Sequence, residues 1–427
     1  MKKEIFESNI GESYVKAVLD CGLEVYVMEK DKYSSSFAIF GTKYGSVDTR
    51  FSKDGGEEIN VPEGIAHFLE HKLFESEDGD AFEKYAKTGA SANAFTSFDR
   101  TCYLFSCSDN FYENLGILLN FVQSPYFTDE TVKKEQGIIG QEIRMYEDSP
   151  GWRVMFNMLE KMYQNHSVKI EIAGTEKSIS EITPKLLFDC YNTFYNPANM
   201  FICVVGNVSA DKVLKQIESE ILFSESSIIS RGDFDEPCGV SDNYVSQNLS
   251  VSMPMFCFGY KQNIGNRTVD LKSKVCMSLL LELICGDASP LYARLIRESL
   301  INDEFDTEYF NGRGYATLMF EGESDNPERV AEEIKNEIKR IRQNGIDKKL
   351  FSAVKCAMYG DAIRRFDNVE GIAMQLVDCA VSGYNLFDEI KLLKTVTFED
   401  VYRQLEYFDE DNTVLSVVFP CSNQGGN

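Results

Sequence analysis

Histidine, tryptophan and long apolar runs are scarce in this sequence of 427 residues. It contains 3 histidines and 1 tryptophan. No window approaches the roughly 18 consecutive apolar residues of a membrane span. Glu4, Glu7 and Glu12 interrupt the N-terminal segment that would have to form the apolar core of a secretion signal. We therefore expect a cytoplasmic protein that neither spans nor binds a membrane.

Positive charge is also in short supply. The sequence has 43 Lys and Arg against 68 Asp and Glu, which gives a net charge of −25. Such a surface repels phosphate groups and argues against a nucleic-acid partner. The 12 cysteines are never spaced as CxxC, so the sequence indicates neither a zinc ribbon nor a thioredoxin-type site. With 43% hydrophobic and 26% charged residues, the composition is that of a globular protein, and the length predicts two domains.

The two halves of the sequence resemble each other. Each contains a Thr helix cap, at Thr183 or Thr397, followed by an apolar helical segment, an Asn-containing turn and an apolar strand. The strands are expected at residues 201–205 and 414–418. The offset of 397 − 183 = 214 residues is about half the chain. This repetition predicts a duplicated domain.

Residues 226–245 are rich in Ser, Gly, Asp and Pro and are the predicted linker. The prediction is a domain at residues 1–225 that binds the metal, and a homologous domain without a metal site at residues 246–427. Each half mixes strands and helices, so the expected fold is α+β, with two α/β sandwiches packed together. In the first half we expect strands from Leu23, Ser35 and Thr101 and helices at residues 64–74, 111–123 and 129–146.

Two of the three histidines lie four residues apart in the segment HFLEH, as His67 and His71, with Glu70 between them. On a helix these three side chains share one face. Two imidazoles at this spacing suit Zn²⁺, and a carboxylate beside them can hold a water molecule. The pattern is the inverted zincin motif, HxxEH. It predicts one zinc ion per chain.

A catalytic zinc needs a third protein ligand and one open position. The segment DETVKKEQGIIGQEIRMYED offers Glu135 and Glu142, seven residues apart on one helical face. Either could be the ligand, and the other could support a histidine through a hydrogen bond; the spacing does not choose. His166 would close the site as a fourth ligand, so we expect it to be structural.

Three segments, HFLEH, SANAFTSFDRTCYLF and KEQGIIGQEIRMYED, together resemble the peptidase family of pitrilysin, insulin-degrading enzyme and the mitochondrial processing peptidase. Short bacterial members of about 400 residues, with two homologous halves in a clamshell arrangement, are the most similar. The resemblance implies that His67, His71 and Glu142 bind the zinc. It also implies that Glu70 is the general base and Glu135 a supporting acid.

The resemblance further identifies Ser91–Thr96 as an edge strand on which a peptide substrate adds by β-pairing. Asn93, Ala94 and Phe95 are the substrate-binding residues that it implies within this strand. An ordinary buried strand end is the alternative when the segment is taken without the motif.

The second half departs from the family pattern at the substrate clamp, for which active members supply an Arg and a later Tyr. Arg297 stands in the matching context, but residues 303–305 are Asp, Glu and Phe where the Tyr is expected. Arg313 and Tyr315 could replace the missing clamp, but we favour the alternative that they belong to the surface structure. In paired short relatives one chain carries the zinc and a homologous zinc-less chain carries the Arg and Tyr, and this sequence resembles the zinc-bearing member.

The sequence therefore predicts a zinc endopeptidase acting on short or unfolded peptides. It would be the catalytic subunit of a heterodimer, with a homodimer as another arrangement, and processing of a ribosomally made precursor peptide is a role that the resemblance implies. A non-catalytic scaffold is the first alternative, against which the intact metal motif speaks. The second alternative is a zinc hydrolase of another class, against which the edge strand and the duplication speak.

Overall fold

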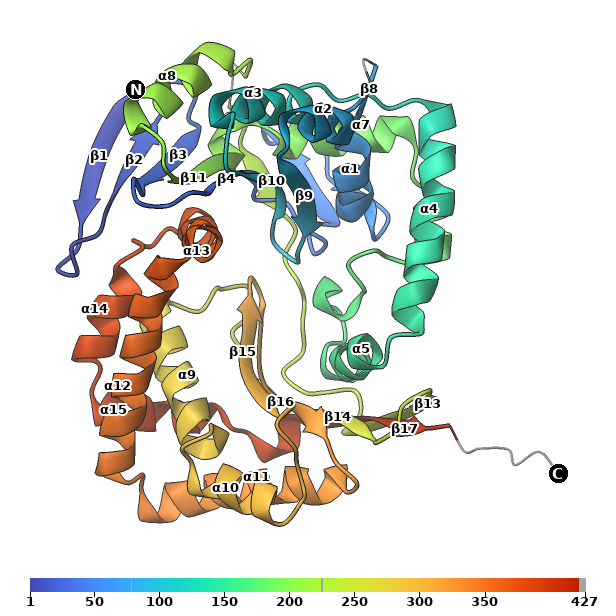
Figure 1. Ribbon diagram of the computed structural model, residues 1–427. Coiled ribbons are helices and arrows are strands. Elements are labelled where there is room, and N and C mark those ends of the chain that lie inside the picture. The colour runs from blue at the N-terminus through green and yellow to red at the C-terminus, as the bar shows by residue number, and fades with distance from the viewer. Residues whose placement is uncertain (78, 224–225, 422–427) are drawn as a thin grey trace. The chain divides into compact units, whose positions relative to one another are not determined.

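The computed structural model describes residues 1–77, 79–223 and 226–421, which divide into two compact units (Figure 1). Each unit is assembled from several stretches of the chain. Unit 1 comprises Met1–Ile143, Glu171–Gly232 and Arg364–Phe387, and unit 2 comprises the described parts of Arg144–Ile170, Asp233–Ile363 and Asp388–Asn427.

A seven-stranded sheet of order β1-β2-β3-β11-β4-β10-β9 forms the centre of unit 1. Neighbouring strands are antiparallel except β3 and β11, which are parallel. The strands are β1 (Lys2–Glu7), β2 (Ser13–Val18), β3 (Glu24–Glu29), β4 (Ser36–Thr42), β9 (Ser91–Thr96), β10 (Thr101–Cys107) and β11 (Met200–Gly206).

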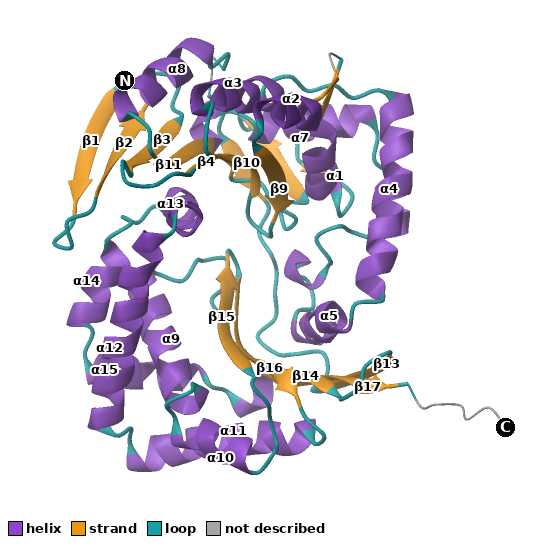
Figure 2. Ribbon diagram, viewed as in Figure 1, coloured by secondary structure: helices purple, strands orange, loops and turns teal. Residues whose placement is uncertain are grey.

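Helices cover both faces of this sheet, whose central strands β4 and β11 are mostly apolar. Every residue of β4 and β11 is buried, as expected for strands that pack on two sides. The ribbon shows α3 and α8 on one face and α13 on the other (Figure 2). The helices of unit 1 are α1 (Ile65–Leu73), α2 (Ala81–Thr88), α3 (Phe111–Val122), α6 (Glu176–Ser180), α7 (Pro184–Phe194), α8 (Ala210–Glu220) and α13 (Val369–Ser382), with α4 (Asp129–Glu147) ending just beyond it.

Unit 2 is built on a five-stranded sheet of order β13-β17-β14-β16-β15. Its strands are β13 (Tyr244–Leu249), β14 (Met255–Lys261), β15 (Asp306–Gly312), β16 (Tyr315–Glu323) and β17 (Thr413–Pro420). The helices are α5 (Pro150–Met162), α9 (Leu271–Cys285), α10 (Pro290–Arg297), α11 (Pro327–Asn344), α12 (Lys348–Arg364), α14 (Asp388–Thr395) and α15 (Phe398–Tyr402).

The sheets confirm the predicted duplication. The parallel pair β13 and β17, followed by antiparallel β14, β16 and β15, repeats the pairing of β3, β11, β4, β10 and β9. The repeated strands β11 and β17 thus take the same place in the two sheets. Thr183 and Thr397 cap the N-termini of α7 and α15 as predicted, by accepting hydrogen bonds from the backbone N–H groups of Leu186 and Asp400.

One helix from each half of the sequence packs on the sheet of the other half. α5 follows α4 along the chain yet packs on β14 and β17, and α13 follows α12 yet packs on β4 and β11. The compact units therefore differ from a division at the predicted linker, because residues 144–170 of the first half belong to unit 2 and residues 364–387 of the second half belong to unit 1. Hydrophobic periodicity cannot show this exchange, since an apolar helix face does not specify which sheet covers it.

The predicted linker also contains structure. Residues 229–231 form β12, which pairs with β5 (Arg50–Lys53), and β5 pairs with β6 (Ile59–Asn60) in a small sheet. A further hairpin joins β7 (Glu75–Ser76) and β8 (Gly79–Asp80).

The membrane prediction can be compared with the helices. Within the described residues, no single helix has both the length and the apolar composition to cross a membrane. α9 and α10 have the required length and apolar composition only when taken together, and the chain bends by 41° between them.

Gly64 provides a test of how α1 is positioned. Its φ is 85°, and a Cβ atom there would lie 2.3 Å from the carbonyl oxygen of Ala173. We expect Gly64→Ala to lower the free energy of unfolding by about 2 kcal/mol or more, because an L-residue is strained in this region and the backbone of residue 173 blocks the methyl group. Urea denaturation followed by circular dichroism measures the change.

Gly137→Ala is the matched control. Gly137 lies within α4, and a Cβ there would contact nothing within 4 Å. This substitution should stabilise the protein by about 0.5–1 kcal/mol. Equal effects of the two substitutions would contradict the assigned role of Gly64.

Candidate active site

The candidate site starts on α1, a helix that is buried almost along its whole length. Gly64 begins the helix in a left-handed conformation. Eight of its nine residues are then buried, His67 and Glu70 among them, while His71 is half-buried. The rings of His67 and His71 meet edge to face, with centroids 4.6 Å apart and 63° between their planes. The helical spacing predicted from HFLEH therefore brings the two imidazoles together.

α4 supplies the carboxylates. Glu142 Oε1 lies 3.6 Å from His67 Nε2, and Glu142 Oε2 lies 3.5 Å from His71 Nε2. Glu135, two turns earlier, places Oε1 3.1 Å from His71 Nδ1. Glu142 thus faces the Nε2 atoms of both rings, whereas Glu135 supports the opposite side of the His71 ring; which of the two binds a metal stays a prediction.

The spacing of three of these side chains suits a single metal ion. One ligand atom each from His67, His71 and Glu142 lies within 4.8 Å of the others. Ligands bound about 2.0–2.1 Å from a tetrahedral zinc lie about 3.3–3.4 Å apart, close to the observed nitrogen-to-oxygen distances. His71 can donate its Nδ1 hydrogen to Glu135, which leaves Nε2 for a metal. His67 Nδ1 is buried and has no hydrogen-bond partner among the described residues.

Glu70 is tied to the neighbouring edge strand. The Thr96 hydroxyl, at the end of β9, donates a hydrogen bond of 2.6 Å to Glu70 Oε2. Thr96 was not among the residues predicted from the sequence, although it ends the SANAFT segment. The bond links the carboxylate beside the metal cluster to the strand predicted to bind peptide.

Lys72 and Glu75 were also missed by the sequence analysis. The Lys72 side chain is fully buried, and its ammonium group binds Glu75 Oε2 and lies 3.9 Å from Glu135 Oε2. No periodic pattern marks Lys72 for burial, because both faces of α1 are covered.

Burial dominates the titration of the site. It lowers the pKa of His67 to about 3, with a further contribution from His71, and raises the pKa of Glu70 to about 7 against the opposing bond from Thr96. Burial would also lower the pKa of His71. The hydrogen bond to Glu135 and the charges of Glu70 and Glu142 outweigh it, so the pKa of His71 is raised.

The predicted substrate strand is the edge of the sheet in unit 1. β9 pairs with β10 and is the last strand in the sheet order. Asn93 is exposed and accepts a hydrogen bond from the Ala94 backbone, while Ala94 and Phe95 are half-buried. The edge of β9 that faces away from β10 is not paired with another strand of the described sheet.

The predicted residues of the second half lie in unit 2. Arg297 ends α10 and is exposed. Tyr315 is buried and its ring packs edge-on against His166. The Arg313 guanidinium lies over the ring of Phe234. The roles of Arg297, Arg313 and Tyr315 in substrate binding stay predictions.

His166 has a structural environment. Its Nδ1 accepts a hydrogen bond from the Val168 backbone, and its Nε2 bonds the carbonyl of Arg313 at 2.9 Å. Burial lowers the pKa of its imidazole to about 4. Both ring nitrogens are engaged, in agreement with the structural role expected for this histidine.

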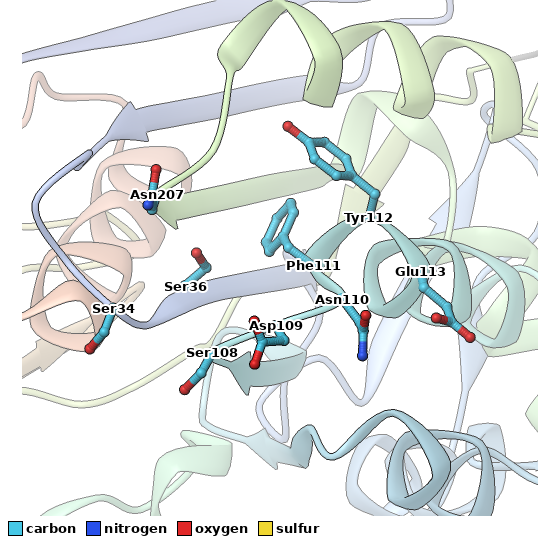
Figure 3. A pocket seen from close by; sticks show the side chains of 9 residues that line it. All are labelled: Ser34, Ser36, Ser108, Asp109, Asn110, Phe111, Tyr112, Glu113 and Asn207. Carbon is cyan, nitrogen blue, oxygen red and sulfur yellow. The ribbon is translucent and has the colours of Figure 1, made fainter.

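A polar pocket of about 460 Å³ lies at the other end of β10 (Figure 3). Thr101 begins β10 opposite Thr96, whereas Ser108 and Asp109 follow its last residue. The length of the strand therefore separates the pocket from Glu70. Its lining consists of Ser34, Ser36, Ser108, Asp109, Asn110, Phe111, Tyr112, Glu113 and Asn207.

Two family models match the chain. One, described as insulinase (peptidase family M16), covers residues 57–176 and so includes the three candidate metal ligands, His67, His71 and Glu142. The other, described as the peptidase M16 inactive domain, covers residues 181–358. The two matches divide the chain between a half with the metal motif and a half without it.

Relatives extend the likeness over the whole chain. The chain is 39% identical to a protein named zinc protease YmfH from Bacillus subtilis, over 99% of this chain and 100% of the relative. A structure described as an M16-like peptidase from Alicyclobacillus acidocaldarius matches with a TM-score of 0.92 and 33% identity, over 97% of this chain and 100% of the other.

A more distant relative is a mitochondrial-processing peptidase subunit beta from Arabidopsis thaliana. It is 26% identical over 41% of this chain and 34% of the relative. Together with the geometry of the metal cluster, the full-length matches show that the chain belongs to the insulinase family of peptidases, peptidase family M16.

Proposed function

We propose that the protein is a zinc-dependent endopeptidase that cleaves short or unfolded peptides. The observation that carries the proposal is the convergence of His67, His71 and Glu142 on one point, with Glu70 held beside them by the strand β9. The names of its relatives as zinc proteases agree with this chemistry.

His67, His71 and Glu142 would hold one Zn²⁺ ion per chain. Bound zinc lowers the pKa of a coordinated water to about 7 and polarises a carbonyl group. The three residues come from the two helices α1 and α4, and a zinc ion held by them would have one position open for water or substrate. Glu135 keeps the His71 ring in place by its bond to Nδ1.

Glu70 is the residue that we propose moves the proton. The Thr96 hydroxyl donates its hydrogen bond to Oε2 of Glu70. Oε1 of the same carboxylate can therefore accept the proton of a water molecule that attacks the peptide carbonyl. The same carboxyl group then delivers the proton to the leaving amine. Its bond to Thr96 fixes the carboxylate relative to the strand that would present the peptide.

The unpaired edge of β9 supports a peptide as the substrate. An extended chain can add to such an edge through main-chain hydrogen bonds, which require little of its sequence. Asn93, Ala94 and Phe95 would line the added peptide. Removal of a leader from a ribosomally made precursor is one process that needs this kind of recognition.

We further propose that the chain works with a homologous partner that lacks zinc. The related mitochondrial-processing peptidase chain is named as a subunit, and the second half of this chain matches an M16 domain described as inactive. A homodimer is the other arrangement.

A cytoplasmic location is supported by the cysteines, all of which are free thiols.

A scaffold without catalysis is the alternative function. The match of residues 181–358 to an inactive domain favours it. The ligand set and Glu70 in the first half favour an enzyme, because a scaffold would not need a carboxylate held beside a metal site.

Glu70→Gln tests the proton transfer. The purified protein should contain close to one zinc per chain, and the variant should keep this zinc but lose at least about 100-fold in peptide hydrolysis, because an amide cannot accept the proton. Metal analysis and cleavage of a quenched fluorescent peptide measure the two properties. Glu130→Gln, a change in the exposed first turn of α4, should alter neither, and a Glu70→Gln protein with normal turnover would remove Glu70 as the base.

Glu142→Ala and Glu135→Ala test the assignment of the ligand. Loss of Glu142 removes a metal ligand, whereas loss of Glu135 removes only the support of His71 and should weaken binding about 10- to 100-fold. Glu142→Ala should therefore raise the zinc dissociation constant more than Glu135→Ala does. Competition with a chromophoric chelator gives both constants, and the reverse order would exchange the two roles.

Mixing experiments test the partner. The isolated chain should cleave peptides poorly, and a homologous M16 chain without the HxxEH motif should raise the rate when the two are mixed. Analytical ultracentrifugation of the mixture should show a complex of one copy each. Full activity of the isolated chain would contradict the pairing.

A further inference from the structure

A lysine lies completely buried beside the metal cluster. Lys72 follows His71 directly in α1, and its side chain has 0% exposure. A buried ammonium group is costly unless it is paired. Its partners are Glu75 Oε2 and, at 3.9 Å, Glu135 Oε2.

We propose that Lys72 is a positioning residue that holds Glu135, and through Glu135 the ring of His71, in the geometry that binds the metal. The inference rests on the proposed function, because it gives Lys72 a role toward the zinc that the enzyme would use. It goes beyond that function by assigning part of the metal affinity to a residue outside the HxxEH motif.

The contacts form a continuous chain. Lys72 Nζ attracts Glu135 Oε2, the other carboxylate oxygen of Glu135 bonds His71 Nδ1 at 3.1 Å, and His71 Nε2 faces Glu142. Because each oxygen of Glu135 has a different partner, rotation of the carboxylate about its bond would disturb one of the two contacts. The ring of His71 is thereby held with Nε2 toward the cluster.

The orientation of His71 is the part of the site that most needs such support. His67 Nδ1 has no hydrogen-bond partner among the described residues, so no contact like that of His71 with Glu135 orients its ring from this side. His71 is more exposed, with 24% of its side chain accessible against 10% for His67. The hydrogen bond to Glu135 compensates for this weaker packing.

Charge gives a second reason for Lys72. Glu70, Glu135 and Glu142 lie around the two histidines, and in the low-dielectric interior their carboxylates repel one another. Lys72 lies between Glu75 and Glu135 and reduces this repulsion. A neutral side chain there would remove the ammonium group that lies 3.9 Å from Glu135 Oε2.

A double-mutant cycle on zinc affinity separates positioning from structural filling. We expect Lys72→Met, which keeps the length of the side chain but removes its charge, to raise the zinc dissociation constant about 10- to 100-fold. In a Glu135→Gln background the same change should cost less than about 3-fold, because the residue through which Lys72 acts is already altered. Equal costs in both backgrounds would overturn the proposal.

Glu75→Gln is the matched control, because it removes the other partner of Lys72 and leaves Glu135 unchanged. We expect it to change the zinc dissociation constant by less than about 3-fold. A loss as large as that of Lys72→Met would assign the role of Lys72 to its pair with Glu75 and would also overturn the proposal.

Cobalt substitution gives a readout that a purely structural role would not move. The visible absorption of Co²⁺ in the full-length protein reports the geometry of its ligands, and Lys72→Met should change it whereas Glu75→Gln should not. Lys72→Arg should restore the affinity and the spectrum in part. If Lys72→Met does not fold, Lys72→Gln replaces it in the same cycle.

The binding measurements also distinguish the two hypotheses. A wild-type protein that binds zinc with the expected coupling but cleaves no peptide would refute the proposed function and support the role of Lys72. If substitution of His67 and His71 left the zinc affinity unchanged, both proposals would be refuted.

Discussion

The site depends on one turn of a buried helix. α1 places two imidazoles and a carboxylate on the same face within the interior of unit 1, where charges are poorly solvated. The neighbouring elements supply the polar and charged partners that these buried groups need. α4 contributes the carboxylates that face the rings, β9 contributes the hydroxyl that holds Glu70, and Lys72 supplies the balancing positive charge.

The duplicated architecture shows how little of the chemistry belongs to the fold itself. α9 precedes α10 and the hairpin of β15 and β16, just as α1 precedes α2 and the hairpin of β9 and β10. Yet α9 is apolar over most of its length and contains no histidine. The same framework therefore supports a candidate metal site in one half and only a packed core in the other, because the side chains differ.

The sequence predicted those features that depend on local spacing. HFLEH specified the shared face of His67, Glu70 and His71, and the repeated helix caps specified the duplication. Which of Glu135 and Glu142 faces the Nε2 atoms depends on how α4 passes α1, and the spacing within one helix does not contain this information. Thr96 and Lys72 were missed because their roles come from tertiary contacts, and a lysine in a helix is ordinarily solvent-exposed.

The exchange of α5 and α13 has a consequence for synthesis on the ribosome. One face of the first sheet is covered by α13, whose last residue is Ser382, so this face stays bare until most of the polypeptide has emerged. The hydrophobic strands β4 and β11 are then open to aggregation during translation, at the stage when a chaperone that shields nascent chains can act. Neither half, cut at the connecting segment, would carry the helix that completes its own sheet.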